Sequence, residues 1–210
     1  MRAPQRSELV VALHAAADAG PALVGTKAAT LGRLVQAGLA VPEGIALTSA
    51  AYDAMLADGD FGAQPAEQQL LTAPLPAEVS AAIDEIAASF GDATLVVRSS
   101  AVDEDGTSAS YAGQFETVLH VPAATGLADA VRRCWASAHS ARARAYRGTR
   151  AGAPMAVLAQ RQVPADVAGV AFTADPVTGD RARVLVSAVP GLGDTLTDGS
   201  RQPDEWSVCG

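Results

Sequence analysis

A short apolar stretch that ends in an arginine and leads directly into two serines and a small-residue loop most constrains how this chain folds. The run Leu95 to Val97 predicts a buried strand, which is expected to stop at Arg98. Residues 99–115 then supply hydroxyl groups, carboxylates and glycines, including Gly113, a composition typical of a loop. A guanidinium group at a strand end suits an anion, because its planar fork donates two parallel bonds to phosphate oxygens.

A structural role for the same arginine remains an alternative at this point. Arg98 can instead pair with Asp103 or Asp105 in an ordinary surface loop, since structural ion pairs are common. Chemistry alone therefore leaves an anion site and a surface ion pair equally open.

The first half of the chain predicts three helices. Apolar residues recur at helical spacing from Thr26 until Gly38 ends the helix. A second helix is expected over 49–57 with Ser49 as its N-cap, and a third from Ala77 to Phe90. The stretch 58–76, rich in Gly, Ala, Gln and Pro, is expected to be a mobile connection.

Lys27 lies in the first turn of the first predicted helix, shortly after Gly25. Backbone N–H groups and the helix dipole attract an anion at such a position. A lone lysine on a helix is more often simply solvated, so this residue does not decide the function by itself.

The second half predicts one long helix and several strands. The helix is expected from Leu127 to about Arg147, with Arg132, Arg142 and Arg144 on a solvated face. Strands are expected at 116–121, 155–163, 167–173 and 183–189, with a tight turn at 174–180.

Charge and cysteine content exclude several classes of function. A net charge of −8 argues against a nucleic-acid partner, so a phosphate site must be local. Cys134 and Cys209 lack metal-ligand spacing, and Cys134 is expected to be a buried free thiol. No apolar run approaches the roughly 20 residues that span a bilayer. These features predict a cytoplasmic protein without a membrane partner.

Four ordered blocks of sequence carry a family resemblance. Residues 95–118 resemble the V-R-S-S-A…E-D…S-F-A-G-Q…T-F-L signature of the ATP-binding domain of phosphoenolpyruvate synthase, pyruvate phosphate dikinase and rifampicin phosphotransferase. Residues 24–52 are similar to that family's opening G-G-K-G-A-N-L-G block, and residues 134–147 to its V-W-A-S…R-A…Y-R helix. Residues 156–208, with Q-R-Q-V-P-A-D-V-A-G-V-A-F-T-A-D-P-V-T-G-D, form the last block.

The resemblance implies a nucleotide site. Lys27 and Arg98 match the family's phosphate-contacting lysine and arginine. Gly113 and Thr117 match positions in the loop that closes over the phosphates, and Gln160 matches the glutamine that reads the adenine. The expected ligand is ATP with Mg²⁺. The sequence departs from the family in Gly25-Thr26-Lys27-Ala28, where the family usually has further glycines.

The implied fold is α+β and ATP-grasp-like. We expect an N-terminal lobe over residues 1–160 and a partial, incomplete second lobe over 161–210. Asp204-Glu205-Trp206 fits the family's earlier P-D-x-Y strand, and no later L-Q-x-R follows it. Metal ligands therefore stay unassigned.

The resemblance also implies how the domain works. It predicts an ATP-binding domain of a phosphoenolpyruvate-synthase-like phosphotransferase that presents phosphate to a histidine on another domain, a missing segment or another chain. The three histidines, His14, His120 and His139, lie outside the family's phosphohistidine motif and are expected to be structural. The alternative is a non-catalytic, truncated nucleotide-binding or interaction module. The final acceptor, whether pyruvate, phosphate or an antibiotic hydroxyl, stays open.

Overall fold

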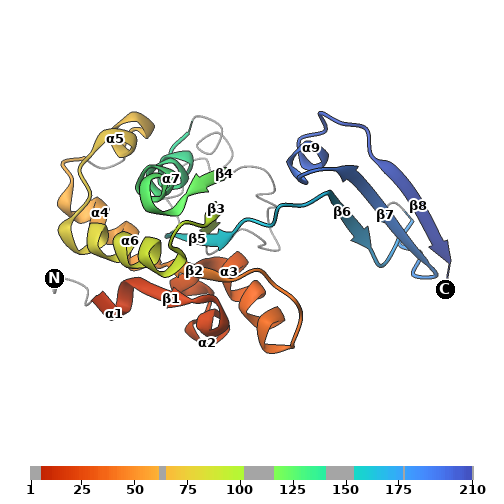
Figure 1. Ribbon diagram of the computed structural model, residues 1–210. Helices are drawn as coiled ribbons and strands as arrows, with labels where there is room; N and C mark the ends of the chain where they lie inside the picture. Colours follow the sequence, from red (N-terminus) through yellow and green to blue (C-terminus); the bar gives the residue numbers. More distant parts are fainter. Residues whose placement is uncertain (1–5, 62–64, 102–115, 141–153, 177, 210) are drawn as a thin grey trace. The chain divides into compact units, whose positions relative to one another are not determined.

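The chain forms two compact units, Met1–Gln162 and Val163–Gly210, in a computed structural model that describes residues 6–61, 65–101, 116–140, 154–176 and 178–209. Both units contain antiparallel sheet, and the first also carries most of the helices, so the predicted α+β class is confirmed (Figure 1). Among the described residues, no helix is long and apolar enough to cross a lipid bilayer.

The first unit is a five-stranded sheet with helices on both faces. Its elements are α1 Arg6–Leu9, β1 Val10–Ala12, the 3-10 helix η1 Leu13–Ala15, α2 Ala16–Ala19, α3 Pro21–Gln36, β2 Gly44–Leu47, α4 Ser49–Asp58, α5 Glu67–Thr72, α6 Ala77–Phe90, β3 Thr94–Ala101, β4 Thr117–Pro122, α7 Ala123–Ser137 and β5 Met155–Arg161. The strand order is β1-β2-β5-β3-β4, and every neighbouring pair is antiparallel.

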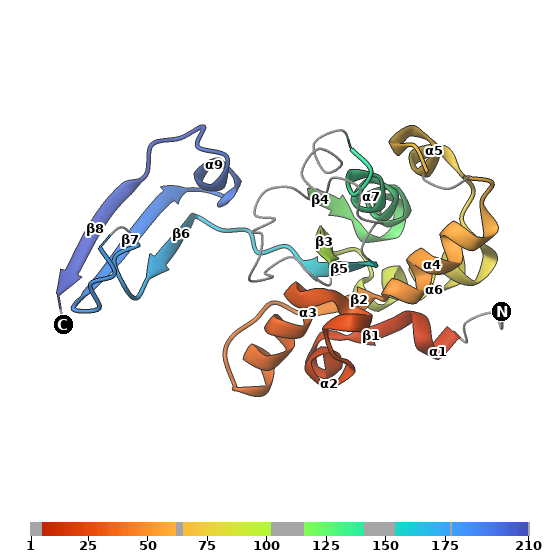
Figure 2. The same cartoon turned by 180° about the vertical axis from the view of Figure 1, so that it is seen from behind.

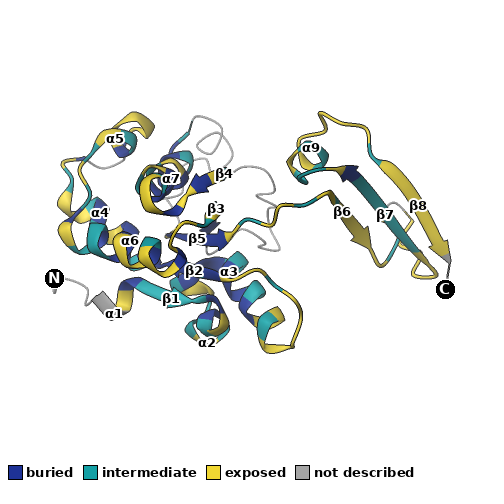
Figure 3. Ribbon diagram, in the orientation of Figure 1, coloured by how far each residue is buried: buried dark blue, intermediate teal, exposed yellow. Residues whose placement is uncertain are grey.

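The two faces of this sheet support two separate cores. Helices α4, α6 and α7 cover one face, whereas α2 and α3 cover the other (Figures 1 and 2). Because side chains alternate along a strand, Val97 enters the larger core under α7 and Leu158 enters the smaller core under α3. Buried segments gather at the centre of the unit, and exposed residues lie along the outer faces of the helices (Figure 3).

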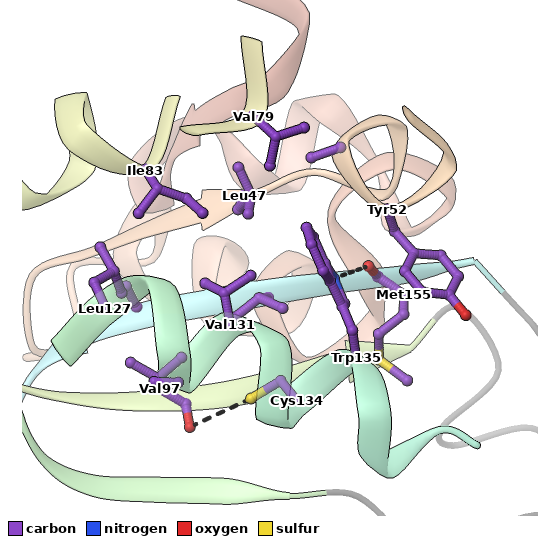
Figure 4. Close-up of a cluster of buried hydrophobic side chains, with 14 of the residues drawn as sticks. Leu47, Tyr52, Val79, Ile83, Val97, Leu127, Val131, Cys134, Trp135 and Met155 are labelled. Carbon is purple, nitrogen blue, oxygen red and sulfur yellow. Dashed lines mark hydrogen bonds between the residues drawn. The ribbon is translucent and has the colours of Figure 1, made fainter. Parts of the chain in front are cut away.

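Trp135 is the largest fully buried side chain of the main core (Figure 4). Its indole Nε1 donates a hydrogen bond to the carbonyl oxygen of Met155 at 3.2 Å, so burial leaves this polar group satisfied. The Tyr52 ring packs against it with 5.8 Å between the ring centroids. This cluster joins α7 to α4 and to the start of β5.

Several predicted elements are confirmed. Helix α6 spans Ala77–Phe90 and ends at Gly91, as the apolar spacing predicts. Helix α3 ends before Gly38, whose φ of +78° and N–H bond to the Val35 carbonyl belong to a Schellman cap. The predicted strands at 116–121 and 155–163 correspond to β4 and β5.

Other predictions were wrong in their bounds. Strand β3 does not stop at Arg98 but continues through Ser99 and Ser100 to Ala101. The long helix begins at Ala123, four residues before the predicted start, and α7 ends at Ser137; Arg142 and Arg144 lie outside the described residues. The first residues of α7 are small and show no apolar periodicity, so the sequence pattern does not reveal this earlier start.

The connection over 58–76 also differs from its prediction. Helix α5 lies within it and buries Leu70 in the main core, so residues 67–72 are anchored by packing. Ser49 is not the N-cap of α4. That position belongs to Thr48, and the Ser49 hydroxyl instead donates to the Ala22 carbonyl at 3.1 Å.

The second unit is a three-stranded antiparallel sheet. Its elements are β6 Val167–Phe172, β7 Arg183–Pro190, α9 Asp194–Thr197 and β8 Asp204–Cys209, with strand order β6-β7-β8. The predicted turn at 174–180 is closed by a backbone hydrogen bond from Asp175 to Asp180 and has Gly179 at a φ of +74°. Phe172, Trp206 and Val208 are exposed on this sheet.

Cys134 provides a test of the main core. Burial raises the pKa of its thiol to about 12, with the nearby Glu116 charge adding to the effect. Because this pKa lies above the ordinary 9.0, the stability contributed by the neutral thiol is present below pH 9 and is lost as pH rises toward 12. In a Cys209→Ser variant at pH 8, we expect alkylation of folded Cys134 by iodoacetamide to be at least about 100-fold slower than in urea. Mass spectrometry measures both rates, and similar rates would contradict the burial.

Candidate functional site

The end of β3 and the first regular turn of α3 meet on one face of the sheet. Within β3, Arg98 and Ser100 lie on the face covered by α3, while Ser99 lies on the face covered by α7. Ser99 and Ser100 are both fully buried, so each hydroxyl needs a partner inside the protein. The Ser99 hydroxyl donates to the Glu116 carbonyl at 3.1 Å, and the Ser100 oxygen accepts from the backbone N–H of Ala28 at 3.1 Å.

Gly25 makes the close approach between α3 and β3 possible. Its φ of +76° interrupts the helix, so that regular α-helix begins after it. A Cβ at this position would lie 2.0 Å from the Ser100 carbonyl oxygen and 2.3 Å from its Oγ. No side chain fits there without a backbone shift, and the turn that carries Lys27 therefore rests directly on the strand.

This contact brings Lys27 to the backbone of β3 next to Arg98. The Lys27 Nζ donates a hydrogen bond to the carbonyl oxygen of Ser99 at 3.0 Å, so the ammonium group lies beside the residue that follows Arg98. Both cationic side chains are half-buried. The C-terminal half of β3 thus carries one cationic residue, Arg98, and accepts a hydrogen bond from a second, Lys27, within a chain of net charge −8.

Thr117 lies opposite Arg98 in the sheet. It is the exposed first residue of β4 and is the register partner of Arg98 across the β3–β4 ladder. Directly opposed residues in a sheet project to the same face. The other neighbour of Arg98 in the sheet is Leu158 of β5, which is buried under α3.

Gln160 lies one pleat away on the same face. It pairs with Val96 of β3 and Gly44 of β2, and its side chain is buried. The side-chain Nε2 donates to the Pro42 carbonyl at 3.1 Å, an interaction that holds the turn before β2. A Cβ on Gly44 would lie 2.8 Å from the Gln160 Cγ, so a glycine makes room for this side chain.

Three residues considered from the sequence cannot be placed. Gly113, Asp103 and Asp105 lie outside the described residues.

The described chain resumes at Glu116, whose backbone N–H donates to the Ser137 hydroxyl at 3.3 Å. The Glu116 carboxylate also pairs with Arg133 of α7. The beginning of β4 is thus tied to α7 and, through Ser99, to β3.

Two of the histidines have structural partners. His139 is buried, and its Nε2 is within hydrogen-bond distance of the Tyr52 hydroxyl. His120 lies in the irregular part of the β3–β4 ladder and has a φ of +56°. The Gln162 side-chain amide accepts a hydrogen bond from its backbone N–H and lies within hydrogen-bond distance of its ring Nδ1. His14 is exposed on η1.

The sequence predicts Lys27 and Arg98 as site residues, but it does not predict the buried serines that position them. The pattern predicts Ser99 and Ser100 as the start of a loop, whereas they are buried strand residues with tertiary partners. The available signal is a pair of hydroxyl residues directly after an apolar strand, together with a glycine shortly before a helical lysine. That pattern does not reveal that the two segments touch.

This geometry defines an α+β domain with two cationic residues at the C-terminal half of β3, which suit a ligand with several negatively charged oxygens. Residues 21–210 match the family described as pyruvate phosphate dikinase, AMP/ATP-binding domain. The chain belongs to this family and is an ATP-binding domain related to those of phosphoenolpyruvate synthases. The predicted family membership is confirmed.

Individual relatives agree with this assignment. The chain is 38% identical over 209 residues to the prodigiosin synthesizing transferase PigC of Serratia marcescens, covering 94% of this chain and 23% of that protein. It is 39% identical to a rifampicin phosphotransferase of a Streptomyces species, covering 95% and 26%, and 34% identical to a probable phosphoenolpyruvate synthase of Staphylothermus marinus, covering 98% and 28%. The chain thus spans about a quarter of the length of these relatives.

Two glycines with nearly equal backbone angles test the contact at Gly25. Gly20 has φ 80° and ψ 159°, close to φ 76° and ψ 161° at Gly25, but a Cβ added to Gly20 would meet nothing within 4 Å, so Gly20→Ala isolates the cost of the backbone angles, about 2 kcal/mol. Gly25→Ala adds overlap with the Ser100 backbone and is expected to cost about 2 kcal/mol more than Gly20→Ala. Urea denaturation of both variants measures the difference, and equal losses would contradict the close approach.

Proposed function

We propose that this chain binds ATP with its phosphates beside Lys27 and Arg98 in the C-terminal half of β3, within an ATP-grasp-like domain. The single observation that carries the proposal is the 3.0 Å hydrogen bond from the Lys27 Nζ to the Ser99 carbonyl, which sets the ammonium next to the backbone of the residue after Arg98. The family match supplies ATP as the ligand class. The two cations supply the charge that a triphosphate needs.

The physical case rests on charge and on the helix dipole. An arginine can hold two phosphate oxygens at once, and a lysine adds a compact point charge. Lys27 also lies in the first turn of the regular part of α3, where the helix dipole favours an anion. These contributions are local, so they do not conflict with the acidic charge of the chain as a whole.

Three further residues complete the proposed nucleotide site. Thr117 offers a hydroxyl beside Arg98, which supports a role near the phosphates. Gly113 is proposed for the loop over the phosphates on the resemblance alone. Gln160 is proposed to read the adenine edge on the resemblance alone, and its amide oxygen would do so because its Nε2 is engaged with the Pro42 carbonyl.

Mg²⁺ is proposed as the companion of ATP. This ion typically binds through phosphates and one or two carboxylates and keeps several waters. In the part of the chain that the structure describes, no group of three or more His, Cys, Asp or Glu side chains could hold a metal. The described residues therefore offer no protein cage, and the phosphates themselves would supply much of the coordination. Bound there, the ion would neutralise phosphate charge.

We further propose that the domain presents a phosphate of ATP to a histidine on another domain or chain. His139 and His120 are engaged with Tyr52 and Gln162, which supports an acceptor other than these two. In such a transfer the role of Lys27 and Arg98 is to hold and neutralise the phosphates, since phosphoryl transfer depends mainly on positioning and charge. The two units are proposed to be the two lobes of the ATP-grasp domain, divided near residue 160.

Arg98→Ala tests the proposed site. We expect this change to weaken ATP binding by about 2 kcal/mol, because a charge-assisted bidentate contact is lost from a half-buried position. Isothermal titration calorimetry of the wild type and the variant measures the difference.

Arg33→Ala is the matched control. Arg33 is an exposed arginine of α3 whose guanidinium donates to Thr30 at 2.9 Å, and removing it changes the net charge equally. We expect this variant to keep the wild-type affinity for ATP. Equal affinities in wild type and Arg98→Ala, with the fold intact by circular dichroism, would remove Arg98 from the site.

A further inference from the structure

Ser100 is an unusual residue for its place in the sheet. It is fully buried, and it sits on the face of β3 that is covered by α3. A hydroxyl in such a place costs stability unless it is hydrogen-bonded. Its oxygen accepts the backbone N–H of Ala28 at 3.1 Å, in a buried contact between residues 72 positions apart in the sequence.

The partner of this hydroxyl belongs to the turn that carries Lys27. N–H groups in the first turn of a helix have no acceptor within the helix, so the Ser100 oxygen supplies one from outside. The absent side chain at Gly25 lets the same turn approach the Ser100 backbone. Lys27 precedes Ala28 directly, and its Nζ reaches the carbonyl of Ser99, the residue before Ser100.

The turn is therefore fixed to the strand at neighbouring points. The Ser100 hydroxyl holds its backbone at Ala28, while the side chain of Lys27 reaches the backbone of Ser99. The first contact sets where the base of the lysine side chain lies relative to Arg98. Without it, the turn keeps the packing at Gly25 and the Lys27 bond but loses the hydrogen bond from Ala28 to the Ser100 side chain, and a phosphate held by both cations is sensitive to a shift of the turn.

We propose that Ser100 is a positioning residue of the nucleotide site, which fixes the spacing of Lys27 from Arg98 through the Ala28 N–H without touching the nucleotide. This inference rests on the function proposed above. The buried Ser100 hydroxyl would then affect phosphate binding indirectly, through the position of Lys27.

Ser100→Ala tests the role by comparing two ligands. ATP probes the phosphate contacts, whereas adenosine has no phosphate and probes only the base and ribose contacts. We expect Ser100→Ala to weaken ATP binding about tenfold while adenosine binding changes less than about twofold, because the lost hydrogen bond acts on the phosphate side. Calorimetry for ATP and NMR titration for adenosine give the two affinities.

Thr48→Val is the control for the loss of a buried hydroxyl. Thr48 is equally buried, and its hydroxyl donates to the Glu8 carbonyl at 2.8 Å, a bond that does not involve the turn that carries Lys27. We expect this variant to lose stability like Ser100→Ala but to show no selective loss for ATP. Equal weakening of ATP and adenosine in Ser100→Ala, or the same selective loss in Thr48→Val, would overturn the positioning role.

Lys27→Met separates this inference from the proposed function. If Lys27→Met binds ATP as tightly as the wild type, the proposed phosphate site fails. If Lys27→Met weakens ATP binding and Ser100→Ala does not, the site stands and the positioning role is overturned. Should Ser100→Ala not fold, Ser100→Cys keeps the size and a weak acceptor at this position, and the same ratio of ATP to adenosine affinity decides the question.

Discussion

The close approach of α3 to β3 at Gly25 and Ser100 is the contact on which the candidate site depends. A side chain at Gly25 would overlap the Ser100 backbone, and the Ser100 hydroxyl receives the Ala28 N–H. Two segments far apart in sequence thereby place Lys27 within reach of the Ser99 carbonyl. Without this contact, Lys27 and Arg98 would not lie at the same part of β3. With it, Lys27 bonds the backbone of β3 next to Arg98.

Because side chains alternate along β3, Ser99 and Ser100 lie on opposite faces of the sheet and hold different partners. Ser99 faces the main core and holds the Glu116 carbonyl, which anchors the start of β4. Ser100 faces α3 and holds the turn with Lys27. Arg98 projects to the α3 face, as Ser100 does, so its surroundings are set by rigid elements. A site built in this way needs little reorganisation to receive a polyanion.

Sequence patterns predicted the elements that carry strong apolar periods and clear stops. The helix ending at Gly91 and the cap at Gly38 followed from local spacing and from the backbone freedom of glycine. The continuation of β3 through Ser100 could not be predicted, because its hydroxyl is satisfied by a partner 72 residues away. The helix over Glu67–Thr72 was missed for a similar reason, since packing of one leucine stabilises it. Likewise, the sequence named Lys27 and Arg98 through a family resemblance, but their proximity depends on tertiary contact.

The central claim is that Lys27 and Arg98 together hold the phosphates of ATP beside the C-terminal half of β3. A crystal structure of the 210-residue chain with a non-hydrolysable ATP analogue and Mg²⁺ tests it most directly. We predict that the Lys27 Nζ and the Arg98 guanidinium each lie within about 3.2 Å of phosphate oxygens. Phosphates bound elsewhere, with neither side chain in contact with them, would contradict it.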